Sequence, residues 1–387
     1  MHGFSKRYDA VVVGGRVAGA STAMLLARAG CKVLLIDRQA YGSDRLSTHA
    51  LMRGAVTLLN DWGVLPSLMA EDTPAVRQTS FIYAGEAVTL DIKPDGHTDC
   101  LIAPRRTVLD RQLADAAETS GAEVRHGTAL RELVFDRHGR VIGCMIANED
   151  GVQETIRADL VIGADGRQSS VARLTGAETY RQGVTASGCV YGYFEGMPDR
   201  GFEWYFGDGV AAGAIPTNHG QHCVFVSAAS HRFASLFRDD IRAGFVRVCA
   251  ANSPELAEVV KSARLCERLK GFGGQPGYFR QSFGEGWALV GDAGYFKDPI
   301  TAHGITDAFR DAFLLARAIT GGQPEGLAGY QALRDELSAD LFDITESVAA
   351  YDWDMPAVQA MHYRLSRAMK SEAEVLNSML GVSRLAA

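Results

Sequence analysis

The stretch VVVGGRVAGAS, residues 11–21, constrains the fold of this chain more than any other feature. A valine-rich run that ends in two glycines predicts a buried strand and a tight turn, and the alanine- and leucine-rich residues up to Gly30 predict a buried helix. A second apolar run, CKVLLIDR, contains Asp37 near its end. Together these elements predict a β-α-β unit that binds a dinucleotide, with the acid accepting hydrogen bonds from a ribose.

One position of the glycine turn departs from the dinucleotide pattern. Gly14 suits the sharp turn and Gly19 allows helix and strand to approach closely, but Arg16 stands where the pattern has the glycine that faces the pyrophosphate. A side chain at this position projects from the turn, and its guanidinium can pair with a phosphate. The alternative for Arg16 is a surface arginine on a loop. The glycines could instead form a tight turn without a ligand, and Asp37 could be a solvated residue at a strand end.

Two further strand-plus-acid elements lie downstream. ADLVIGADGRQSSVARLTG, residues 158–176, predicts a strand that ends at Asp165 and a short helix capped by serines. GWALVGDAGYFKDPITAHGITDAFRDAFLLARAI, residues 286–319, predicts a strand that ends at Asp292, a loop, and a long amphipathic helix that begins near Gly304. Three such elements, each more than a hundred residues from the next, are hard to obtain by chance.

In order and spacing, the three motifs resemble those of the flavoprotein monooxygenases of the para-hydroxybenzoate hydroxylase fold, a superfamily that also contains flavin-dependent halogenases and geranylgeranyl-reductase-like enzymes. The resemblance covers roughly residues 7–320. It implies an α/β fold in which a Rossmann-like FAD-binding domain carries an inserted antiparallel-sheet substrate domain and a C-terminal helical segment. We expect the FAD-binding domain at 1–76, 104–183 and 275–320, the sheet domain at 77–103 and 184–274, and the C-terminal helices at 321–387.

The resemblance also implies FAD as the cofactor. Asp37 would hold the adenosine ribose and Asp292 the ribityl or pyrophosphate end, while the helix at Gly304 would direct its positive end at the flavin ring. Arg45, in a loop before a helix, and Arg106, in an R-x-x-L helix, occupy positions at which the family places arginines beside the cofactor. The expected FAD-binding residues are Gly14, Gly15, Arg16, Ala18, Gly19, Asp37, Arg38, Arg45, Arg106, Leu130, Asp292, Pro299, Gly304 and Ile305.

Two departures from the family pattern concern the reductant. Ala172 stands where the second motif has its arginine, with Arg173 one residue late, and Tyr295 stands where the third motif has a histidine. These changes affect the nicotinamide contacts of the family more than its FAD contacts. We expect NAD(P)H as the reductant, and FADH₂ from a partner flavin reductase is the alternative.

The middle of the chain predicts the substrate site. Residues 77–103 and 185–230 alternate apolar and polar residues around glycine-rich turns, which predicts antiparallel strands. In the family, such a sheet covers the reactive edge of the flavin. The candidate pocket walls are Trp204, Tyr191, Tyr193 and Tyr205, with a simple aromatic core as the alternative. The candidate catalytic residues are His303, at the flavin-side helix, and His49, for which a loop histidine without a chemical role is the alternative.

Composition disfavours several other classes of protein. The net charge of −7 provides no general attraction for nucleic acid. The seven cysteines are scattered without a CxxC pair, which predicts free thiols and no metal site. Without an apolar run of 18 residues or a signal-peptide pattern, we expect a cytoplasmic protein that does not insert stably into a membrane. The residues after 320 are expected to pack on the flavin domain or to close the pocket, and the oligomeric state is left open.

Four functions are compatible with these features. The favoured one is a monooxygenase, in which a flavin C4a-hydroperoxide formed with O₂ delivers one oxygen atom to a small aromatic or polyketide-like organic substrate. A flavin-dependent reductase or saturase of a lipid-like or polyene substrate is the first alternative. Halogenases of this superfamily resemble one another in a WxWxIP stretch and a lysine on an early strand. Here FEWYFGDGVAAGAIPT contains one tryptophan, well before Ile215-Pro216, and residues 77–92 contain no lysine, so a halogenase is disfavoured. A flavin-binding protein without turnover is the remaining alternative.

Overall fold

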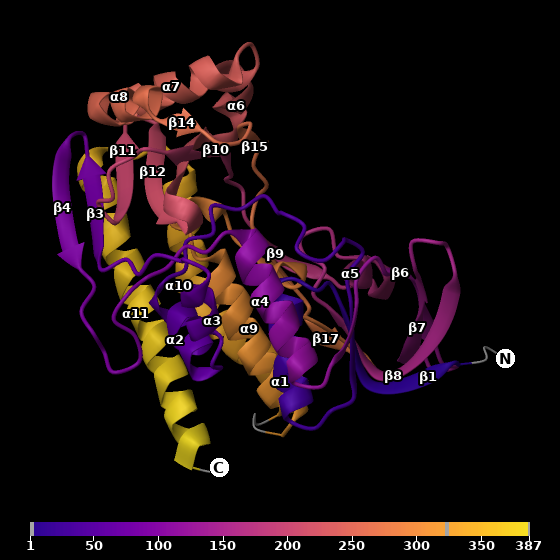
Figure 1. The fold of residues 1–387 in the computed structure, drawn as a ribbon. Coiled ribbons are helices and arrows are strands. Elements are labelled where there is room, and N and C mark those ends of the chain that lie inside the picture. The colour runs from indigo at the N-terminus through magenta and orange to yellow at the C-terminus, as the bar shows by residue number, and fades with distance from the viewer. Residues whose placement is uncertain (1–3, 322–324, 386–387) are drawn as a thin grey trace.

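Two large sheets form the framework of the molecule (Figure 1). The computed structural model describes residues 4–321 and 325–385, with side chains described as far as residue 381. The first sheet has the strand order β17-β18-β8-β1-β2-β5, and β7 and β6 extend it from β8. Its strands are β1 (Lys6–Val13), β2 (Val33–Ile36), β5 (Glu123–Arg125), β6 (Ala129–Phe135), β7 (Val141–Ala147), β8 (Gln153–Gly163), β17 (Phe283–Gly284) and β18 (Trp287–Leu289).

Strand β1 is apolar without alternation because both of its faces are buried. Val12 belongs to the apolar cluster on one face of the first sheet, whereas Val11 and Val13 belong to the cluster on the other. Its neighbours β2 and β8 both run parallel to it. Central strands of parallel sheets are covered on both faces, so they read as continuous hydrophobic runs. The valine run therefore specifies a central strand, and the predicted strand, helix and strand at residues 6–36 are confirmed.

Helices cover one face of the first sheet. Helices α1, α4 and α9 pack on it, and α1 contacts both α4 and α9, with α2, α10 and α11 outside them (Figure 1). The helices on this side are α1 (Val17–Arg28), α2 (Arg53–Asp61), α3 (Leu65–Ala70), α4 (Arg106–Thr119), α9 (Gly304–Ile319), α10 (Gly326–Ala349) and α11 (Met355–Leu385). The other face carries the short helix α5 (Ser170–Thr175), which Ser169 caps by accepting a hydrogen bond from the amide of Ala172. The predicted α/β fold class is confirmed.

The second sheet has the order β14-β10-β13-β12-β11-β3-β4, with β15 also paired to β10. All its pairs are antiparallel except β11 and β3, which run parallel, so the expectation of a purely antiparallel sheet is wrong at this one pair. Strands joined by a short hairpin are antiparallel. Strands β3 and β11 come from distant parts of the chain, so no hairpin fixes their relative direction. The strands are β3 (Gln78–Tyr83), β4 (Glu86–Asp91), β10 (Ser187–Glu195), β11 (Phe202–Gly207), β12 (Val210–Thr217), β13 (Gln221–Ala229), β14 (Arg264–Leu265) and β15 (Lys270–Phe272).

The two faces of the second sheet have different coverings. The outer face packs against α6 (Ser230–Phe237), α7 (Ile241–Asn252) and α8 (Pro254–Ser262). The inner face packs against the loop around Ala50 and against Tyr351, Trp353 and Val358 from the C-terminal segment. The C-terminal segment therefore packs on the first domain as expected, because α10 packs on α9 and α11 on α2. Closure of a substrate pocket by this segment stays a prediction.

A small third sheet and a buried carboxylate lie where the two large sheets meet. The order of this sheet is β19 (Tyr295–Phe296), β16 (Tyr278–Arg280) and β9 (Thr179–Gln182). Asp298 accepts hydrogen bonds from the Ser187 amide at 2.6 Å and the Ser187 hydroxyl at 2.5 Å. Burial raises the pKa of Asp298 to about 6, although these donors oppose the shift. The loop before α9 is thereby fixed to the first residue of β10.

The seven cysteines are free thiols, as the sequence predicted. Within residues 4–321 and 325–385, helices long and apolar enough to cross a bilayer do not occur.

We expect Gly19→Ala to destabilise the protein by about 3 kcal/mol or more, because overpacking against backbone atoms cannot be relieved by side-chain rotation. A Cβ at this position would lie 1.7 Å from the Gly14 carbonyl oxygen. Urea unfolding without added ligand measures the effect. Gly273→Ala is the matched control, since its Cβ would meet nothing within 4 Å, and equal stabilities of the two variants would contradict the expectation.

Candidate functional site

The three sequence motifs meet at one edge of the first sheet. Strands β18, β8 and β1 are adjacent and parallel, so their carboxyl ends lie side by side. A Cβ on Gly14 would lie 2.5 Å from the carbonyl oxygen of Ala164, and one on Gly291 would lie 2.9 Å from the Cβ of Ala18. Ligands of open α/β sheets bind at such carboxyl edges. The contact also places Ala18, a predicted cofactor residue, where the first and third motifs touch.

The N-terminus of α1 opens onto this edge. Arg16 is the N-cap residue, and its side chain makes no capping hydrogen bond; the first turn contains no acidic residue. The free amide groups and the helix dipole together favour an anion at such a terminus. Asp37, at the end of β2, accepts hydrogen bonds from the amides of Gly15 and Gln39, both at 2.8 Å. The predicted ribose acceptor is therefore held rigidly beside the glycine turn.

Four predicted arginines gather around the same edge. Arg16 forms ion pairs with Asp110 at 2.8 Å and with Asp37 at 3.5 Å. Arg106 also pairs with Asp110, at 3.0 Å. Burial lowers the pKa of Arg45, and the neighbouring cations Arg16, Arg38 and Arg106 lower it further, while Asp37 opposes the shift. The cations outnumber the two carboxylates between them, which suits a ligand that carries phosphates.

Asp110 is a residue that the sequence reasoning missed. It is buried on α4 and forms ion pairs with both Arg16 and Arg106. The spacing of four residues between Arg106 and Asp110 on a helix was the available signal, because such pairs face each other. Arg16 is thus neither free nor a plain surface residue, since it also donates to the carbonyl oxygen and the hydroxyl of Ser43.

The remaining residues predicted for the adenosine end lie close by. A nearly filled hollow of about 10 Å³ is lined by Gly15, Arg16, Asp37, Ala40, Tyr41, Gly42, Asp110, Ala114 and His126. Arg38 follows Asp37 and is exposed. Leu130 lies in β6, two residues beyond Thr128, whose amide donates to the Asp37 carbonyl oxygen at 2.8 Å. Neither Arg38 nor Leu130 lines the hollow.

Asp292 has the features of a ligand-binding carboxylate. Its side chain makes no hydrogen bond or ion pair to any other described residue, although its backbone carbonyl accepts from the Tyr278 hydroxyl at 2.6 Å. Burial raises the pKa of Asp292 to about 6, against the opposing charges of Arg167 and Arg106. A desolvated polar group without a partner is costly. A ribityl or ribose hydroxyl would supply that partner, so the donor set fits the diphosphate and ribityl parts of FAD.

The predicted flavin-side helix begins where expected. Helix α9 starts at Gly304, which is exposed; a Cβ on Gly304 would meet nothing within 4 Å. Ile305 is half-buried and Pro299 is exposed in the preceding loop. The side chain of the N-cap residue His303 makes no capping hydrogen bond. The first amide groups of α9 are therefore open toward a ligand, which is compatible with the implied flavin ring.

His303 itself points into a buried charged cluster. Its Nδ1 lies 3.1 Å from an Asp307 oxygen and its Nε2 lies 3.0 Å from an oxygen of Glu372 on α11. Both ring nitrogens are thus engaged by protein carboxylates. Direct proton exchange between His303 and a substrate, its expected catalytic role, would require one of these contacts to break.

His49 lies instead on the inner face of the second sheet. Its Nε2 is 3.0 Å from the Tyr193 hydroxyl, and the two rings stack at 5.6 Å. Burial lowers the pKa of His49 to about 3, and the charges of Arg105 and Arg106 add to the shift. The imidazole is therefore neutral at physiological pH. Next to it, the Tyr191 hydroxyl accepts a hydrogen bond from the Ser47 amide at 3.1 Å.

The four predicted pocket residues do not share one face of the second sheet. Tyr191, Tyr193 and Trp204 belong to the apolar cluster of the inner face. Tyr205 belongs to the cluster of the outer face, under α7 and α8, so its placement in the same pocket is wrong. Successive residues of a strand point to opposite faces, and Trp204 and Tyr205 are successive. Trp204 also donates to the hydroxyl of Thr79 at 3.0 Å.

A charged group beside Tyr193 was not predicted. The Arg105 guanidinium lies 3.5 Å from the centre of the Tyr193 ring, and it pairs with Glu267 at 2.7 Å. Lys270 pairs with Asp44 at 2.6 Å and with Glu267 at 3.1 Å. The two cations and two acids come from segments far apart in the sequence, and only the doublet Arg105-Arg106 gave any signal. This cluster fixes the Tyr193 ring beside His49.

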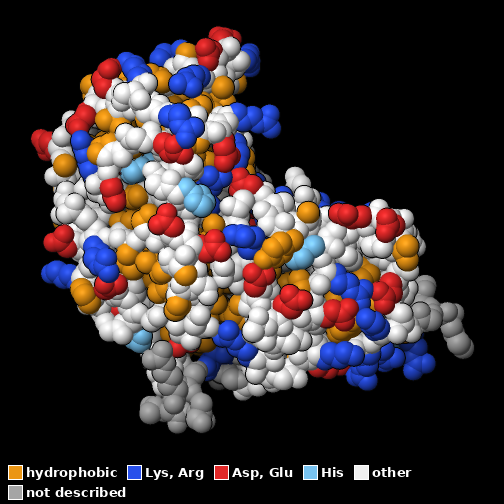
Figure 2. Space-filling model, in the orientation of Figure 1, with side chains coloured by type: hydrophobic (Ala, Val, Ile, Leu, Met, Phe, Trp, Pro, Cys, Tyr) orange, Lys and Arg blue, Asp and Glu red, His pale blue; other side chains and the backbone are white. Residues whose placement is uncertain are grey.

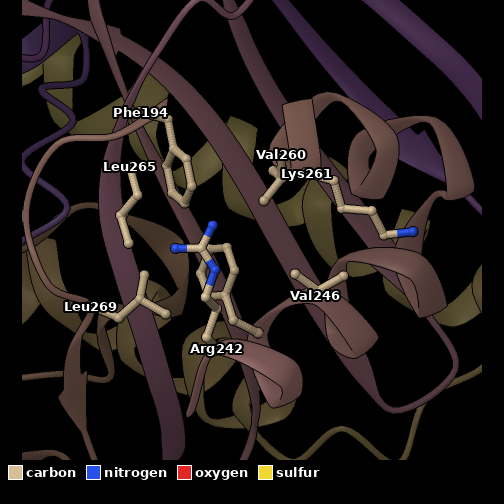
Figure 3. Close-up of a pocket in the computed structure, with 8 residues that line it drawn as sticks. Phe194, Arg242, Val246, Val260, Lys261, Leu265 and Leu269 are labelled. Atoms are coloured by element: carbon tan, nitrogen blue, oxygen red, sulfur yellow. The ribbon is translucent and has the colours of Figure 1, made fainter. Parts of the chain in front are cut away.

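A different cavity, of about 100 Å³, lies on the outer side of the second sheet (Figure 3). It is lined by Phe194, Arg242, Phe245, Val246, Val260, Lys261, Leu265 and Leu269. The lining offers no carboxylate, imidazole, thiol or hydroxyl, and Figure 3 shows the Lys261 ammonium group directed away from the centre. The chemistry-bearing side chains lie on the other side of the sheet.

On the face of the molecule in Figure 2, basic and acidic side chains are interspersed.

The comparisons with known proteins agree with this geometry. The family model described as FAD binding domain matches residues 7–345, and the chain belongs to this family. Digeranylgeranylglycerophospholipid reductase 2 of Methanothermobacter thermautotrophicus is 30% identical over 334 residues, which cover 83% of this chain and 80% of that protein. Rifampicin monooxygenase of Streptomyces venezuelae is 25% identical, covering 94% and 76%. Conditioned medium factor receptor 1 of Dictyostelium discoideum is 25% identical, and the match spans 84% of this chain and 66% of the receptor.

Solved structures share the fold across nearly the whole chain. The flavin-dependent brominase Bmp2 has a TM-score of 0.78 at 19% identity, covering 97% of this chain and 94% of that chain. PqsL of Pseudomonas aeruginosa, in complex with 2-aminobenzoylacetate, has a TM-score of 0.77 at 20% identity, covering 94% and 100%. A geranylgeranyl bacteriochlorophyll reductase-like protein of Thermoplasma acidophilum has a TM-score of 0.74 at 18% identity, covering 97% and 99%. At these identities the likeness shows the fold alone.

We expect Asp292→Ala to weaken FAD binding by about 10- to 100-fold, because a hydrogen bond that involves a charged group contributes about 1.5–3 kcal/mol. Titration of the apoprotein with FAD, followed by flavin fluorescence, measures the change. The control is Asp159→Ala, which removes an exposed carboxylate that pairs with Arg7. Unchanged FAD affinity in Asp292→Ala would remove this residue from the site.

Proposed function

We propose that the chain is an FAD-dependent monooxygenase that acts on a small aromatic or polyketide-like organic substrate. The observation that carries the proposal is the combination of an anion-binding sheet edge with an aromatic sheet face that holds a neutral histidine. In this proposal, residues 1–76, 104–183 and 275–320 hold FAD. Residues 77–103 and 184–274 provide the substrate face, and residues 321–387 close it.

Binding of FAD is assigned to groups at the carboxyl edge. The N-terminal amides of α1 and the cations Arg16, Arg45 and Arg106 would neutralise the diphosphate. Asp37 and Asp292 would accept hydrogen bonds from the hydroxyl groups of the ribose and the ribityl chain. The open first turn of α9 would favour negative charge on the ring system. When bound, FAD supplies the two-electron and O₂ chemistry that no side chain can perform.

The substrate is assigned to the inner face of the second sheet. Trp204 and Tyr191 provide flat apolar walls, and the Trp353 ring from the C-terminal segment packs into the same cluster. Burial raises the pKa of Tyr193, and burial lowers that of His49 to about 3, so the pair is uncharged at neutral pH. The Nε2 atom of His49 lies 3.0 Å from the Tyr193 hydroxyl and can accept its hydrogen bond, which leaves the Tyr193 oxygen able to accept a hydrogen bond from a phenolic substrate. Exclusion of water by the aromatic walls would protect reactive oxygen species from hydrolysis.

The electron donor belongs to the proposal as well. NAD(P)H is the proposed reductant, with FADH₂ delivered by a flavin reductase as the alternative. O₂ is the proposed second substrate.

A flavin-dependent reductase of a polyene or lipid-like substrate is the second candidate. Two observations favour it: the identity of 30% to an archaeal digeranylgeranylglycerophospholipid reductase, and the apolar inner face, against which Met355 and Met361 pack. A reductase needs no O₂ and releases a saturated product. The two candidates therefore differ in a measurable requirement.

We expect the purified protein, reconstituted with FAD, to consume O₂ and to hydroxylate a member of a panel of phenols and aromatic polyketides. NADH, NADPH and chemically reduced FADH₂ are compared as electron donors, and products are identified by mass spectrometry with ¹⁸O₂. Incorporation of ¹⁸O supports the monooxygenase. Anaerobic saturation of a polyene in a parallel panel would replace it with the reductase, and failure to bind FAD would reject both.

We expect Tyr193→Phe to lower kcat/KM roughly 3- to 10-fold with the best substrate, because a hydrogen bond typically contributes about 0.5–1.5 kcal/mol. The variant removes the hydroxyl that contacts His49 and keeps the aromatic wall. Tyr205→Phe is the matched control, since this tyrosine faces the outer helices. Equal kcat/KM values for the two variants would exclude a hydrogen bond between Tyr193 and the substrate. FAD content is measured in both variants to separate binding from turnover.

A further inference from the structure

A buried charged cluster joins helix α9 to the C-terminal helix α11. Contiguous ion pairs connect six side chains, none of which is more than 5% exposed. The six are Lys297, His303, Asp307, Arg310, Asp311 and Glu372. Glu372 is the only member that belongs to α11. Burial of charges in this number is expensive unless they are mutually paired, so the arrangement calls for an explanation.

The contacts of His303 specify its protonation state. Asp307 lies 3.1 Å from Nδ1 and Glu372 lies 3.0 Å from Nε2. An ionised carboxylate only accepts hydrogen bonds, and a neutral imidazole has a single N–H group. Both contacts are therefore satisfied together only when both nitrogens carry protons. Lys297 lies 3.4 Å from the same Nδ1, but its closer partner is Asp307, to which it donates.

The charge of the cluster leads to the same state. Lys297 and Arg310 provide two permanent positive charges, and Arg310 pairs with Asp307 at 3.2 Å, with Glu372 at 2.7 Å and with Asp311 at 2.7 Å. Three carboxylates face these two cations. A doubly protonated His303 balances the six directly connected groups, whereas a neutral His303 would leave one uncompensated negative charge in the interior.

The helix dipole makes the partners of His303 necessary. His303 is the N-cap residue of α9, where the positive end of the helix dipole disfavours a positive charge. Burial by itself lowers the pKa of His303, and Lys297 acts in the same direction. Glu372 and Asp307 outweigh both effects, and the pKa lies above its usual 6.5. The largest contribution that raises the pKa of His303 is the charge of Glu372.

His303, Asp307 and Glu372 lie close enough together to suggest a cation site. However, Asp307 already forms ion pairs with Lys297 and Arg310, and Glu372 forms one with Arg310. These cations compensate the two carboxylates without a metal ion.

We propose that Glu372 is a positioning residue that holds His303 as an imidazolium at the N-terminus of α9, so that docking of α11 fixes an ion pair whose positive member lies behind the proposed flavin end of the site. The protonation state follows from this chain alone. Its effect on FAD rests on the proposed function. Glu372 would thereby influence the electronic environment of the flavin end through His303.

The proposal has a defined consequence for stability. The raised pKa of His303 means that its contribution to stability is complete below about pH 6.5 and is lost as the pH rises through the folded-state pKa. Burial opposes ionisation of Glu372, but His303 and Arg310 lower its pKa overall, so its contribution is lost as the pH falls below about 4.5. The Glu372–His303 pair therefore stabilises the fold from about pH 4.5 up to the folded-state pKa of His303, which lies above 6.5.

We expect His303 to carry protons on both ring nitrogens at pH 7 in the wild-type protein without FAD. ¹H–¹⁵N correlation spectra of protein labelled at its ten histidines measure this, with His303→Gln to assign the signal. In Glu372→Gln the titration midpoint of His303 should fall by at least one pH unit, a tenfold change in proton affinity. Glu374→Gln is the matched control, because Glu374 is two residues away on the same helix and exposed.

A neutral His303 at pH 7 in the wild-type protein would overturn the proposal, and this result needs no folded variant. An unchanged titration in folded Glu372→Gln would overturn it as well. With FAD bound, Glu372→Gln should lower the midpoint potential of the flavin, because the variant loses both members of the ion pair and the imidazolium, at the N-terminus of α9, is the member on the proposed flavin side. Glu372→Asp should restore part of the shift. A protein that fails to bind FAD would refute the proposed function while the histidine titration still tests the role of Glu372.

Discussion

The close approach of backbone at Gly14, Gly19 and Ala164 is the contact on which the rest of the structure depends. A Cβ on Gly19 would lie 1.7 Å from the Gly14 carbonyl oxygen, and one on Gly14 would lie 2.5 Å from that of Ala164. Only glycine allows helix α1 to pack so tightly on β1 and the end of β8. The same contact points the first amides of α1 at the sheet edge where Asp292 and the start of α9 also arrive. A larger residue would separate the three motifs that form the candidate FAD site.

Charge is arranged differently at the two ends of this site. Around α1, four arginines surround Asp37 and Asp110 in a partly open setting, so positive charge is left over for an anionic ligand. Behind α9, cations and carboxylates are fully buried and balance one another when His303 is protonated. Because breaking a buried pair leaves an uncompensated charge, such a cluster strongly restricts how α11 can dock. The excess positive charge around α1 suits binding of an anionic ligand, whereas the balanced cluster behind α9 suits a fixed position of α11.

Particular residues show how far the sequence could be interpreted. The glycine turn, Asp37, Asp292 and the start of α9 were predictable because each depends on a local pattern at the end of a strand. Tyr205 was misplaced because the aromatic run FEWYF shows which residues are apolar but not which of the two alternating sets faces the flavin side. Asp110, Arg105 and Glu372 were not singled out, since their importance depends on partners up to 162 residues away.

The sequence by itself determined the family, the α/β fold and the three strand-end motifs that meet at one sheet edge, because glycine spacing and hydrophobic periodicity act over a few neighbouring residues. It also determined that Arg16 belongs to a β-α-β turn, but not what that side chain contacts. Only the tertiary structure decided that Arg16 pairs with Asp110, that Tyr193 rather than Tyr205 faces His49, and that His303 is enclosed by Glu372. Each of these contacts joins distant segments, so it is fixed by the packing of whole helices and sheets and not by any local pattern.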